Sequence, residues 1–367
     1  MKIILAPDSY KDCLSAIDVC RAMEEGIRRV VPSADVVLLP IADGGEGTLD
    51  ALSYGTALQT VTEPTVDPLG RPINATYGLD GTTAVVELAQ ASGLQLLAPA
   101  ERNPEKASTY GTGLQIQSAI EKGAKQICIT LGGSATTDGG MGILRALGGH
   151  FYDANGNLLE GCGADLQRVA SMDLSQLPKD LSFRLICDVK NPLFGPNGAA
   201  YIYGPQKGAD PDMVERLDKG LQNLHTVALK HGIETDGIAA GAAGGVGSLQ
   251  GFLSAEVVSG IDWILEQCQF SRQLDTADLV ITGEGKTDAQ TLNGKAMYGI
   301  ATAAKAKGVP VIGISGSLGT DLDGLYRCGV TALFSICNRP MPLSDALSNA
   351  STLIANQTEN VMRTLAI

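Results

Sequence analysis

QICITLGGSATTDGG, residues 126–140, limits the folds open to this chain more than any other stretch. Its first five residues form a run without regular polar alternation, which is typical of a parallel strand buried on both faces. Four glycines with hydroxylated and acidic side chains follow, and a helical pattern begins near residue 140. Because glycine costs backbone entropy, we expect something to approach this turn closely, such as a ligand. Strand, turn and helix together form the repeating unit of α/β proteins.

The same unit recurs on both sides of this stretch. Apolar runs predict strands at residues 2–6, 35–39, 183–187, 199–203, 278–282, 309–314 and 331–336. Helical spacing predicts helices at residues 15–31, from residue 48, and at 112–122, 140–147, 211–231, 294–307 and 344–365. Ser15 and Asp18 fit a capping box at the start of the first helix. Residues 59–88 differ, because short β-prone runs around turns predict antiparallel hairpins.

The order of these elements predicts two domains. At 367 residues the chain exceeds the size at which a single core keeps growing. We expect a Rossmann/flavodoxin-like parallel-sheet domain formed by both chain ends, residues 1–60 plus 275–367. Residues 61–274 are expected to form an inserted α/β domain with a mixed sheet.

Composition excludes several classes of partner. The formal net charge of −13 and the single tryptophan argue against binding to nucleic acid or to an anionic membrane. The eight cysteines include no CxxC pair and several lie in apolar runs, which favours a reduced protein. The chain shows no signal-peptide pattern at its start and no run long enough to cross a bilayer, so we expect a cytoplasmic location.

Polar residues collect where predicted strands end. In open α/β sheets, ligands bind at the carboxyl ends of the strands. Candidate binding residues in these loops are Asp8, Ser9, Gly44, Gly45, Glu46, Gly132, Gly133, Ser134, Thr136, Thr137 and Asn191. Glycine lets backbone N–H groups face an anion, and a following helix adds the positive end of its dipole. One such loop is readily explained as a tight turn with a helix cap, whereas five in one chain favour a binding site.

Lysines and acids share these loops. Lys11, Lys207, Lys286 and Lys295 lie in or beside glycine-rich segments of an acidic protein, which favours phosphate or carboxylate binding if they converge. Asp43, Glu46, Asp188, Glu284 and Asp288 are candidates for holding Mg²⁺ together with substrate phosphates, for capping helices or for pairing with the lysines. Asp138 is a candidate metal ligand, general base or helix cap.

Several common signatures are missing from the sequence. It contains no P-loop, no dinucleotide fingerprint and no protein-kinase motif. The three histidines form no HExxH or HxH pattern, and no G-x-S-x-G elbow occurs. The residues by themselves therefore indicate an α/β enzyme that binds a small anionic ligand, such as a phosphorylated one.

Taken together, the loops resemble the type I glycerate kinase family of bacteria. The resemblance runs from ILAPDSYK at residue 3 through PIADGGEGT, GGSATTDGG, CDVKNP, GPQKG and GAAGG to GEGKTDAQ and Gly294-Lys295. It covers essentially the whole chain in order. It implies ATP-dependent phosphorylation of D-glycerate with Mg²⁺, in a cleft between two α/β domains, and 2-phosphoglycerate is the product common in the family.

This resemblance allows roles to be suggested from residue chemistry. Asp188 is the first candidate for the base that orients the attacking hydroxyl, and Asp43 is the second. Lys11 and Lys207 are candidates to pair with the glycerate carboxylate or the transferring phosphoryl group. Glu284, Asp288 and Asp138 are the candidate metal ligands.

Three alternatives remain open at this point. They are formation of 3-phosphoglycerate, a kinase for another small hydroxy acid, and a sensor that binds a sugar acid without catalysis. A nicotinamide dehydrogenase is disfavoured by the missing fingerprint. The sequence leaves the oligomeric state open, and an oligomer is compatible with it.

Overall fold

The computed structural model describes residues 1–11, 13–42, 44–45, 47–292 and 294–365. The chain divides into two compact units. The first contains residues 1–43, 50–57 and 259–367, and the second contains residues 44–49 and 58–258. Residues 259–274, which the sequence boundaries assign to the inserted domain, belong to the first unit.

The first unit is built on a parallel sheet in the order β15-β13-β11-β1-β2. Its strands are β1 (Lys2–Leu5), β2 (Asp35–Leu38), β11 (Leu279–Thr282), β13 (Val311–Ser315) and β15 (Val330–Ser335), with the short pair β12 (Lys286–Thr287) and β14 (Ser317–Leu318). Its helices are α1 (Ala16–Arg28), most of α2 (Thr48–Gly55), α10 (Gly260–Gln267), α11 (Phe270–Leu274), α12 (Ala296–Ala306), α13 (Asp323–Cys328), α14 (Leu343–Ser348) and α15 (Ala350–Leu365).

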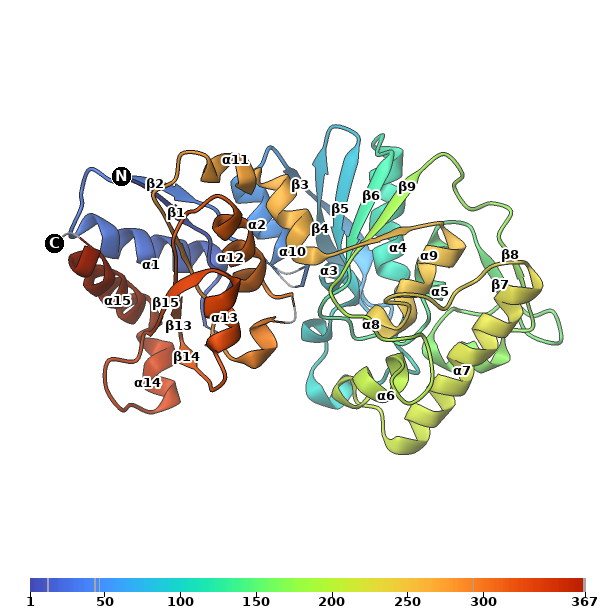
Figure 1. Ribbon diagram of the computed structural model, residues 1–367. Coiled ribbons are helices and arrows are strands. Elements are labelled where there is room, and N and C mark those ends of the chain that lie inside the picture. Colours follow the sequence, from blue (N-terminus) through green and yellow to red (C-terminus); the bar gives the residue numbers. More distant parts are fainter. Residues whose placement is uncertain (12, 43, 46, 293, 366–367) are drawn as a thin grey trace. The chain divides into compact units, whose positions relative to one another are not determined.

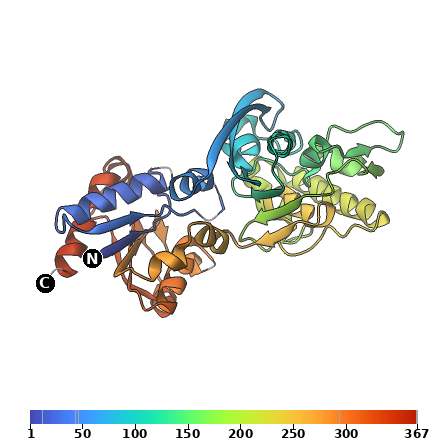
Figure 2. The same cartoon turned by 90° about the horizontal axis from the view of Figure 1, so that it is seen from above.

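This is the flavodoxin-like strand order. All strands are parallel, and the order in which they are added along the sheet reverses between β1 and β11. Helices α1 and α15, from the two ends of the chain, pack against each other and against the same side of the sheet (Figures 1 and 2). Helices α12 and α13 bury a smaller cluster with β15. The α/β class with a parallel sheet is confirmed.

Residues that are close in sequence determine where the first helix of this unit begins. The backbone of Ser15 is extended, and its hydroxyl oxygen accepts a hydrogen bond from the backbone N–H of Asp18 at 3.2 Å. The Ser15 hydroxyl in turn donates to the Asp18 carboxylate. Val19, Met23 and Ile27 then fall on one buried face. The predicted start of this helix is confirmed.

The second unit contains a mixed sheet in the order β10-β9-β6-β5-β4-β3. Strands β5 (Thr83–Glu87), β6 (Gln126–Thr130), β9 (Ser182–Ile186) and β10 (Glu256–Val258) are parallel, and β3 (Gln59–Val66) and β4 (Pro72–Asp80) add an antiparallel edge. The small pair β7 (His150–Tyr152) and β8 (Ser171–Asp173) lies apart. The helices are α3 (Ala89–Ser92), α4 (Tyr110–Glu121), α5 (Met141–Ala146), α6 (Ala199–Tyr203), α7 (Pro211–Lys230), α8 (Ala242–Gly245) and α9 (Leu249–Phe252).

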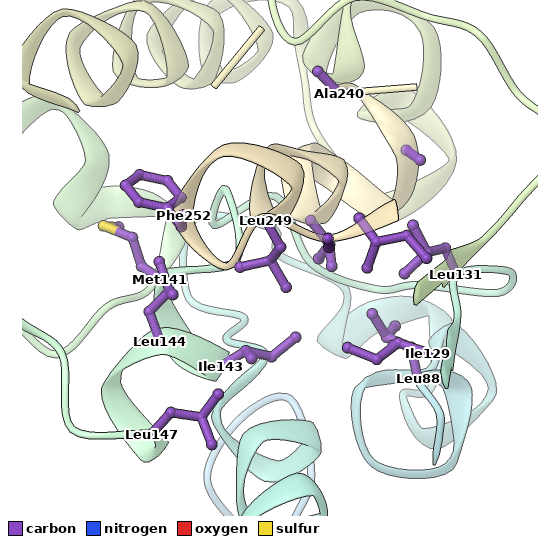
Figure 3. Close-up of a cluster of buried hydrophobic side chains, with 14 of the residues drawn as sticks. Leu88, Ile129, Leu131, Met141, Ile143, Leu144, Leu147, Ala240, Leu249 and Phe252 are labelled. Atoms are coloured by element: carbon purple, nitrogen blue, oxygen red, sulfur yellow. The ribbon is translucent and has the colours of Figure 1, made fainter. Parts of the chain in front are cut away.

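The core of the second unit supports the turn after β6. Figure 3 shows Ile129 of β6, together with Leu88 and Leu131 just after β5 and β6, facing Ile143 of α5 and Leu249 of α9. These side chains are almost fully buried. Each such side chain stabilises the fold by about 1.5–3 kcal/mol. Because β6, α5 and α9 share this core, their packing supports the turn that joins β6 to α5.

Two sequence predictions of secondary structure are wrong in part. Residues 199–203, predicted as a strand, form α6, because Ala199 and Ala200 are buried and the helix packs against α7 and α8. The single helix predicted at 344–365 is two, since α14 ends at Ser348 and α15 begins at Ala350. In the described part of the chain, no helix is both long and apolar enough to cross a membrane.

Candidate active site

The strand ends of the second unit bring several predicted residues to one edge. Strands β5, β6 and β9 are neighbours and parallel, so Glu87, the turn at 131–140 and Asp188 all lie at the carboxyl side of the sheet. The backbone N–H of Leu131 donates to Ile186 O at 3.2 Å, which continues the pairing up to the turn. This edge is where ligands bind in open α/β sheets.

The turn at 131–140 is packed tightly by other backbone segments. A Cβ on Gly132 would overlap the Cα of Gly45, and the Gly132 N–H donates to Gly44 O at 3.3 Å. On the other side, the Ala135 N–H donates to Ser92 O at 2.9 Å. Gly132 is therefore required by an approach of the chain's own backbone.

The glycine/alanine segment at 241–247 closes on the same turn. Gly244 has a φ of +71°, and a Cβ there would overlap the carbonyl oxygen of Thr136. Its own carbonyl oxygen accepts a hydrogen bond from Gly139 N at 3.1 Å, and the Ser248 hydroxyl donates to Gly139 O at 2.9 Å. The contacts of this segment within the second unit are those of a packing turn.

Asp138 caps the start of α5. It is fully buried, and its carboxylate accepts hydrogen bonds from the Thr109 N–H and hydroxyl at 2.7 Å each. Further bonds come from Gly140 N at 3.1 Å and Gly142 N at 3.3 Å, at the start of α5. Burial raises the pKa of this carboxyl group, while the four hydrogen bonds oppose the rise. These contacts support the helix cap among the roles expected for Asp138, and its role as a metal ligand stays a prediction.

Lys207 reaches the turn from a distant part of the chain. Its side chain is 2% exposed, and Nζ donates to Ser134 Oγ at 2.8 Å and to Thr136 O at 2.6 Å. Burial lowers the pKa of the ammonium group to about 7, and the charge of Asp138 opposes that fall. The predicted association of Lys207 with the glycine-rich turn is thus present, although its amine is enclosed by protein.

Three hydroxyl groups near this lysine have no hydrogen-bond partner among the described residues. They are the Oγ1 atoms of Thr130, Thr136 and Thr137, all buried. Buried hydroxyls without a partner are uncommon and call for a physical explanation. Together with Ser134, they place several potential donors around the end of β6.

Asp188 and Asn191 follow β9 at the same edge. Asp188 is half-buried, immediately after Cys187, whose pKa burial raises to about 11. The Asn191 side chain accepts a hydrogen bond from the Tyr203 hydroxyl at 2.7 Å and donates to Asn197 O at 2.9 Å. Asn191 thus orders its own loop, and the exposed Lys190 beside it makes no such contact in the described residues.

Sequence analysis missed Glu87 as a contributor to this edge. Its carboxylate accepts the N–H groups of Gly47 and Leu49, each at 3.1 Å, at the start of α2. Glu87 is buried at the end of an otherwise apolar strand. An acidic residue at the end of such a strand was the feature of the sequence that could have indicated Glu87. Asp43 and Glu46, predicted on the same loop, lie outside the described residues.

The first unit brings a second group of predicted residues to the carboxyl edge of its own sheet. The loop after β1 carries Asp8, Ser9 and Lys11, and the Asp8 N–H donates to Gly283 O at 2.9 Å. This contact joins the loops after β1 and β11, on either side of the point where the strand order reverses. Crevices at such points are the usual ligand sites of doubly wound sheets. Lys11 is exposed there.

The carboxylates of Glu284 and Asp288 differ in their hydrogen bonds and ion pairs. Glu284 Oε1 accepts the hydroxyls of Thr291 at 2.7 Å and Thr287 at 3.0 Å, and its Oε2 lies 3.6 Å from Lys295 Nζ. Asp288 pairs with the largely exposed Lys286 at 3.0 Å. That hydrogen bond, with one from Gln290 N, lowers the pKa of Asp288.

The acids of this loop fit a magnesium ion in part. The described residues include no group of three or more His, Cys, Asp or Glu side chains suited to a metal. Mg²⁺ is, however, usually held by one or two carboxylates and by substrate phosphates. Asp288, with one exposed partner, suits that role better than the enclosed Glu284.

The parallel sheet of the first unit and the donor-rich turn of the second are features of a small-molecule α/β enzyme that handles anions. Residues 3–366 match the Glycerate kinase family, and the chain belongs to that family. It is therefore an enzyme of the phosphotransferase class, with an alcohol group as acceptor.

Individual relatives support this assignment over the full length. The chain is 44% identical to the glycerate kinase of Bacillus subtilis, with 100% of this chain and 98% of the relative covered. It is 43% identical to the glycerate 2-kinase of Escherichia coli, with the same shares covered. The chain is also similar to a crystal structure of a Salmonella typhimurium LT2 protein described as a putative glycerate kinase 2. The two sequences are 42% identical and the two structures match with a TM-score of 0.87, over 100% of this chain and 98% of that chain.

Proposed function

We propose that this protein transfers the γ-phosphoryl group of ATP to D-glycerate and forms 2-phosphoglycerate. The observation that carries the proposal is the strand end and turn at 130–140, where Lys207 donates to Ser134 and Thr136 and three buried threonine hydroxyls have no partner among the described residues. A kinase needs such a set of donors to position and neutralise phosphate. Family membership supplies glycerate as the acceptor, and the name of the Escherichia coli relative supports the 2-position.

The acceptor hydroxyl requires a base, for which Asp188 is our first candidate. It follows β9 at the same sheet edge as the turn and remains half-buried, so it can be reached by substrate. Lys11, exposed on the loop after β1, is our candidate partner of the glycerate carboxylate. Asp43 stays the alternative base. That residues of both units serve one active site stays a prediction.

Mg²⁺ is proposed as the metal, held by Asp288 with Glu284 beside it. When bound with ATP, the ion would neutralise phosphate charge. Lys286 and Lys295, which pair with these acids, would then neutralise the remaining phosphate oxygens. We further propose that the protein acts in the cytoplasm on small molecules only.

The product identifies the reaction. The protein is incubated with D-glycerate, ATP and Mg²⁺, and ³¹P NMR is used to follow the products. The expected result is a 2-phosphoglycerate resonance growing with that of ADP. A 3-phosphoglycerate resonance would overturn the proposed position, phosphorylation of a different hydroxy acid alone would overturn the substrate, and binding without ADP formation would indicate a sensor.

The role of Asp188 is tested by Asp188→Asn. Loss of a general base lowers turnover by about 10²-fold or more, so kcat should fall by that factor while glycerate binding changes little. Asp180→Asn, at an exposed position before the same strand, is the matched control and should keep normal kcat. Unchanged turnover in Asp188→Asn would remove Asp188 from the mechanism and leave Asp43 as the candidate.

A further inference from the structure

We propose that Lys207 is a positioning residue that turns the Ser134 hydroxyl toward a phosphate group and does not itself contact the substrate. This inference rests on the proposed function, because it assigns the anion at the turn to the phosphoryl donor. It differs from the sequence expectation, in which Lys207 pairs directly with substrate.

The enclosure of the amine argues against direct contact. The Lys207 side chain is 2% exposed, and its Nζ lies against Ser134 Oγ and Thr136 O, on the protein side of the turn. Ser134 itself is 7% exposed, and its Oγ is one of the two acceptors of the amine. A ligand can therefore meet the Ser134 hydroxyl while Lys207 stays behind it.

The chemistry of an ammonium group then fixes the direction of the hydroxyl. An ammonium group has three donors and no acceptor, so Ser134 Oγ must accept from a charged Lys207. Its own hydrogen is then directed elsewhere and can be donated to an anion. A neutral amine can accept instead, and the Ser134 hydroxyl can then turn inward to donate to Nζ. The charge of Lys207 thus decides whether Ser134 is a donor to the ligand.

Among the described residues, no carboxylate accepts from the amine of Lys207, whose acceptors are Ser134 Oγ and Thr136 O. The charge of Asp138 acts on the amine, but the oxygens of Asp138 accept from Thr109, Gly140 and Gly142. Nearby, the hydroxyls of Thr130, Thr136 and Thr137 also have no partner among the described residues. Each of these hydroxyls has a hydrogen without an acceptor among the described residues, and a bound anion could accept it.

A coupling between anion binding and protonation follows. Burial holds the pKa of Lys207 at about 7, so near neutral pH a sizeable fraction of the free protein carries a neutral amine. An anion at the turn favours the charged form and raises this pKa. Binding therefore takes up a proton, and anion affinity falls as the pH rises above 7.

The wild-type protein provides a test that needs no variant to fold. Lysine residues are labelled with ¹³C at Cε, and the resonances are titrated with pH, with and without sulfate, whose charge is constant in this range. One lysine should titrate near neutral pH, and sulfate should raise its midpoint by about one pH unit or more. If every lysine titrates at the ordinary value for exposed lysine, or if sulfate leaves the low midpoint unmoved, the inference is wrong.

Lys207→Met tests the effect on catalysis. The lysine resonance that titrates near neutral pH should disappear. The value of kcat/KM for ATP should fall by about 10²-fold, because the Ser134 hydroxyl no longer points toward the phosphate. KM for D-glycerate should change little. The fall should be smallest at alkaline pH, where the wild-type lysine is already neutral. Lys125→Met is the control, because Lys125 is exposed and lies just before β6. This variant should behave as wild type.

The two proposals fail in different ways. If the wild type phosphorylates D-glycerate but Lys207→Met is kinetically normal over the whole pH range, the positioning role is wrong and the function stands. If sulfate shifts the lysine midpoint but no phosphoglycerate forms, the proposed reaction is wrong although the anion-binding turn is present.

Discussion

At the scale of single residues, the glycines of the turn serve the chain's own packing. Their clustering predicted that something, such as a ligand, approaches the turn closely, and in the structure backbone segments do so: Gly45 lies against Gly132, and Gly244 lies against Thr136. Sequence alone could not separate a ligand from another backbone segment, because both demand the same missing Cβ. The partner of Gly244 is more than a hundred residues away in the chain.

Gly244→Ala should therefore disturb the turn more than left-handed backbone strain alone would. Gly232 has a nearly equal φ of +74° with no atom near its missing Cβ, so Gly232→Ala measures that strain separately. We expect Gly232→Ala to lower the free energy of unfolding by about 1–2 kcal/mol. Gly244→Ala should cost clearly more and should also reduce kcat/KM for ATP.

Urea unfolding of both variants, together with steady-state kinetics, measures these effects. Equal losses of stability and normal kinetics in the Gly244 variant would contradict the proposed link between this glycine and the shape of the turn.

The roles of individual polar residues were harder to predict than their presence at the site. Lys207 lies within GPQKG, a motif that indicates an exposed turn, yet its contacts with Ser134 enclose it. Asp138 was predicted as a cap, base or metal ligand, and its contacts to Thr109, which no local pattern reveals, support the cap.

At the scale of elements, buried carboxylates fix where two helices begin. Asp138 accepts backbone N–H groups at the start of α5, and Glu87 does the same for α2. Both helices start beside the turn at 131–140, so these acids position its neighbouring segments.

Glu87→Gln tests this at α2. The amide keeps the shape of the side chain but loses the charge that favours a helix N-terminus, and one of its oxygens is replaced by a donor. We expect the free energy of unfolding to fall by about 1–3 kcal/mol. Glu63→Gln, which breaks a partly exposed ion pair with Lys122, should cost no more than about 1 kcal/mol.

Thermal and urea unfolding monitored by circular dichroism allow the two losses to be compared. A Glu87 variant as stable as the Glu63 variant would show that these backbone contacts contribute little.

Elements were predictable where the determining contacts are local. The start of α1 at Ser15 was predicted because the cap and its partner are three residues apart. Strand β6 was predicted because its apolar run is continuous. Helix α6 was not, since three of its five residues, Tyr201 to Tyr203, are aromatic or β-branched and favour a strand, whereas the helix packs on α7 and α8 through Ala199 and Ala200.

At the scale of the whole molecule, the sequence predicted the α/β class and a parallel sheet built from both chain ends. The sheet order was beyond sequence reasoning, because periodicity identifies strands but not their neighbours. Glu87, Asp188 and the turn at 131–140 are brought to one edge by that order.

A joint requirement for the two units can be tested with one substitution in each. Asp188→Asn alters the second unit and Asp288→Asn the first. If both serve one reaction, each variant should lower kcat, and raised Mg²⁺ should partly restore only the Asp288 variant, because that carboxylate is the proposed metal ligand. Normal phosphorylation by Asp288→Asn at low Mg²⁺ would exclude its metal role.

The pairing of α1 with α15 has a consequence for biosynthesis. The ribosome delivers β1 and α1 first, but their partners β11, β13 and α15 emerge only near the end of translation. Residues 58–258 are contiguous and can fold meanwhile. The amino-terminal segment, with its apolar strand, must wait exposed during that interval. Nascent chains released before α15 is made are therefore expected to be substrates for chaperones and proteases.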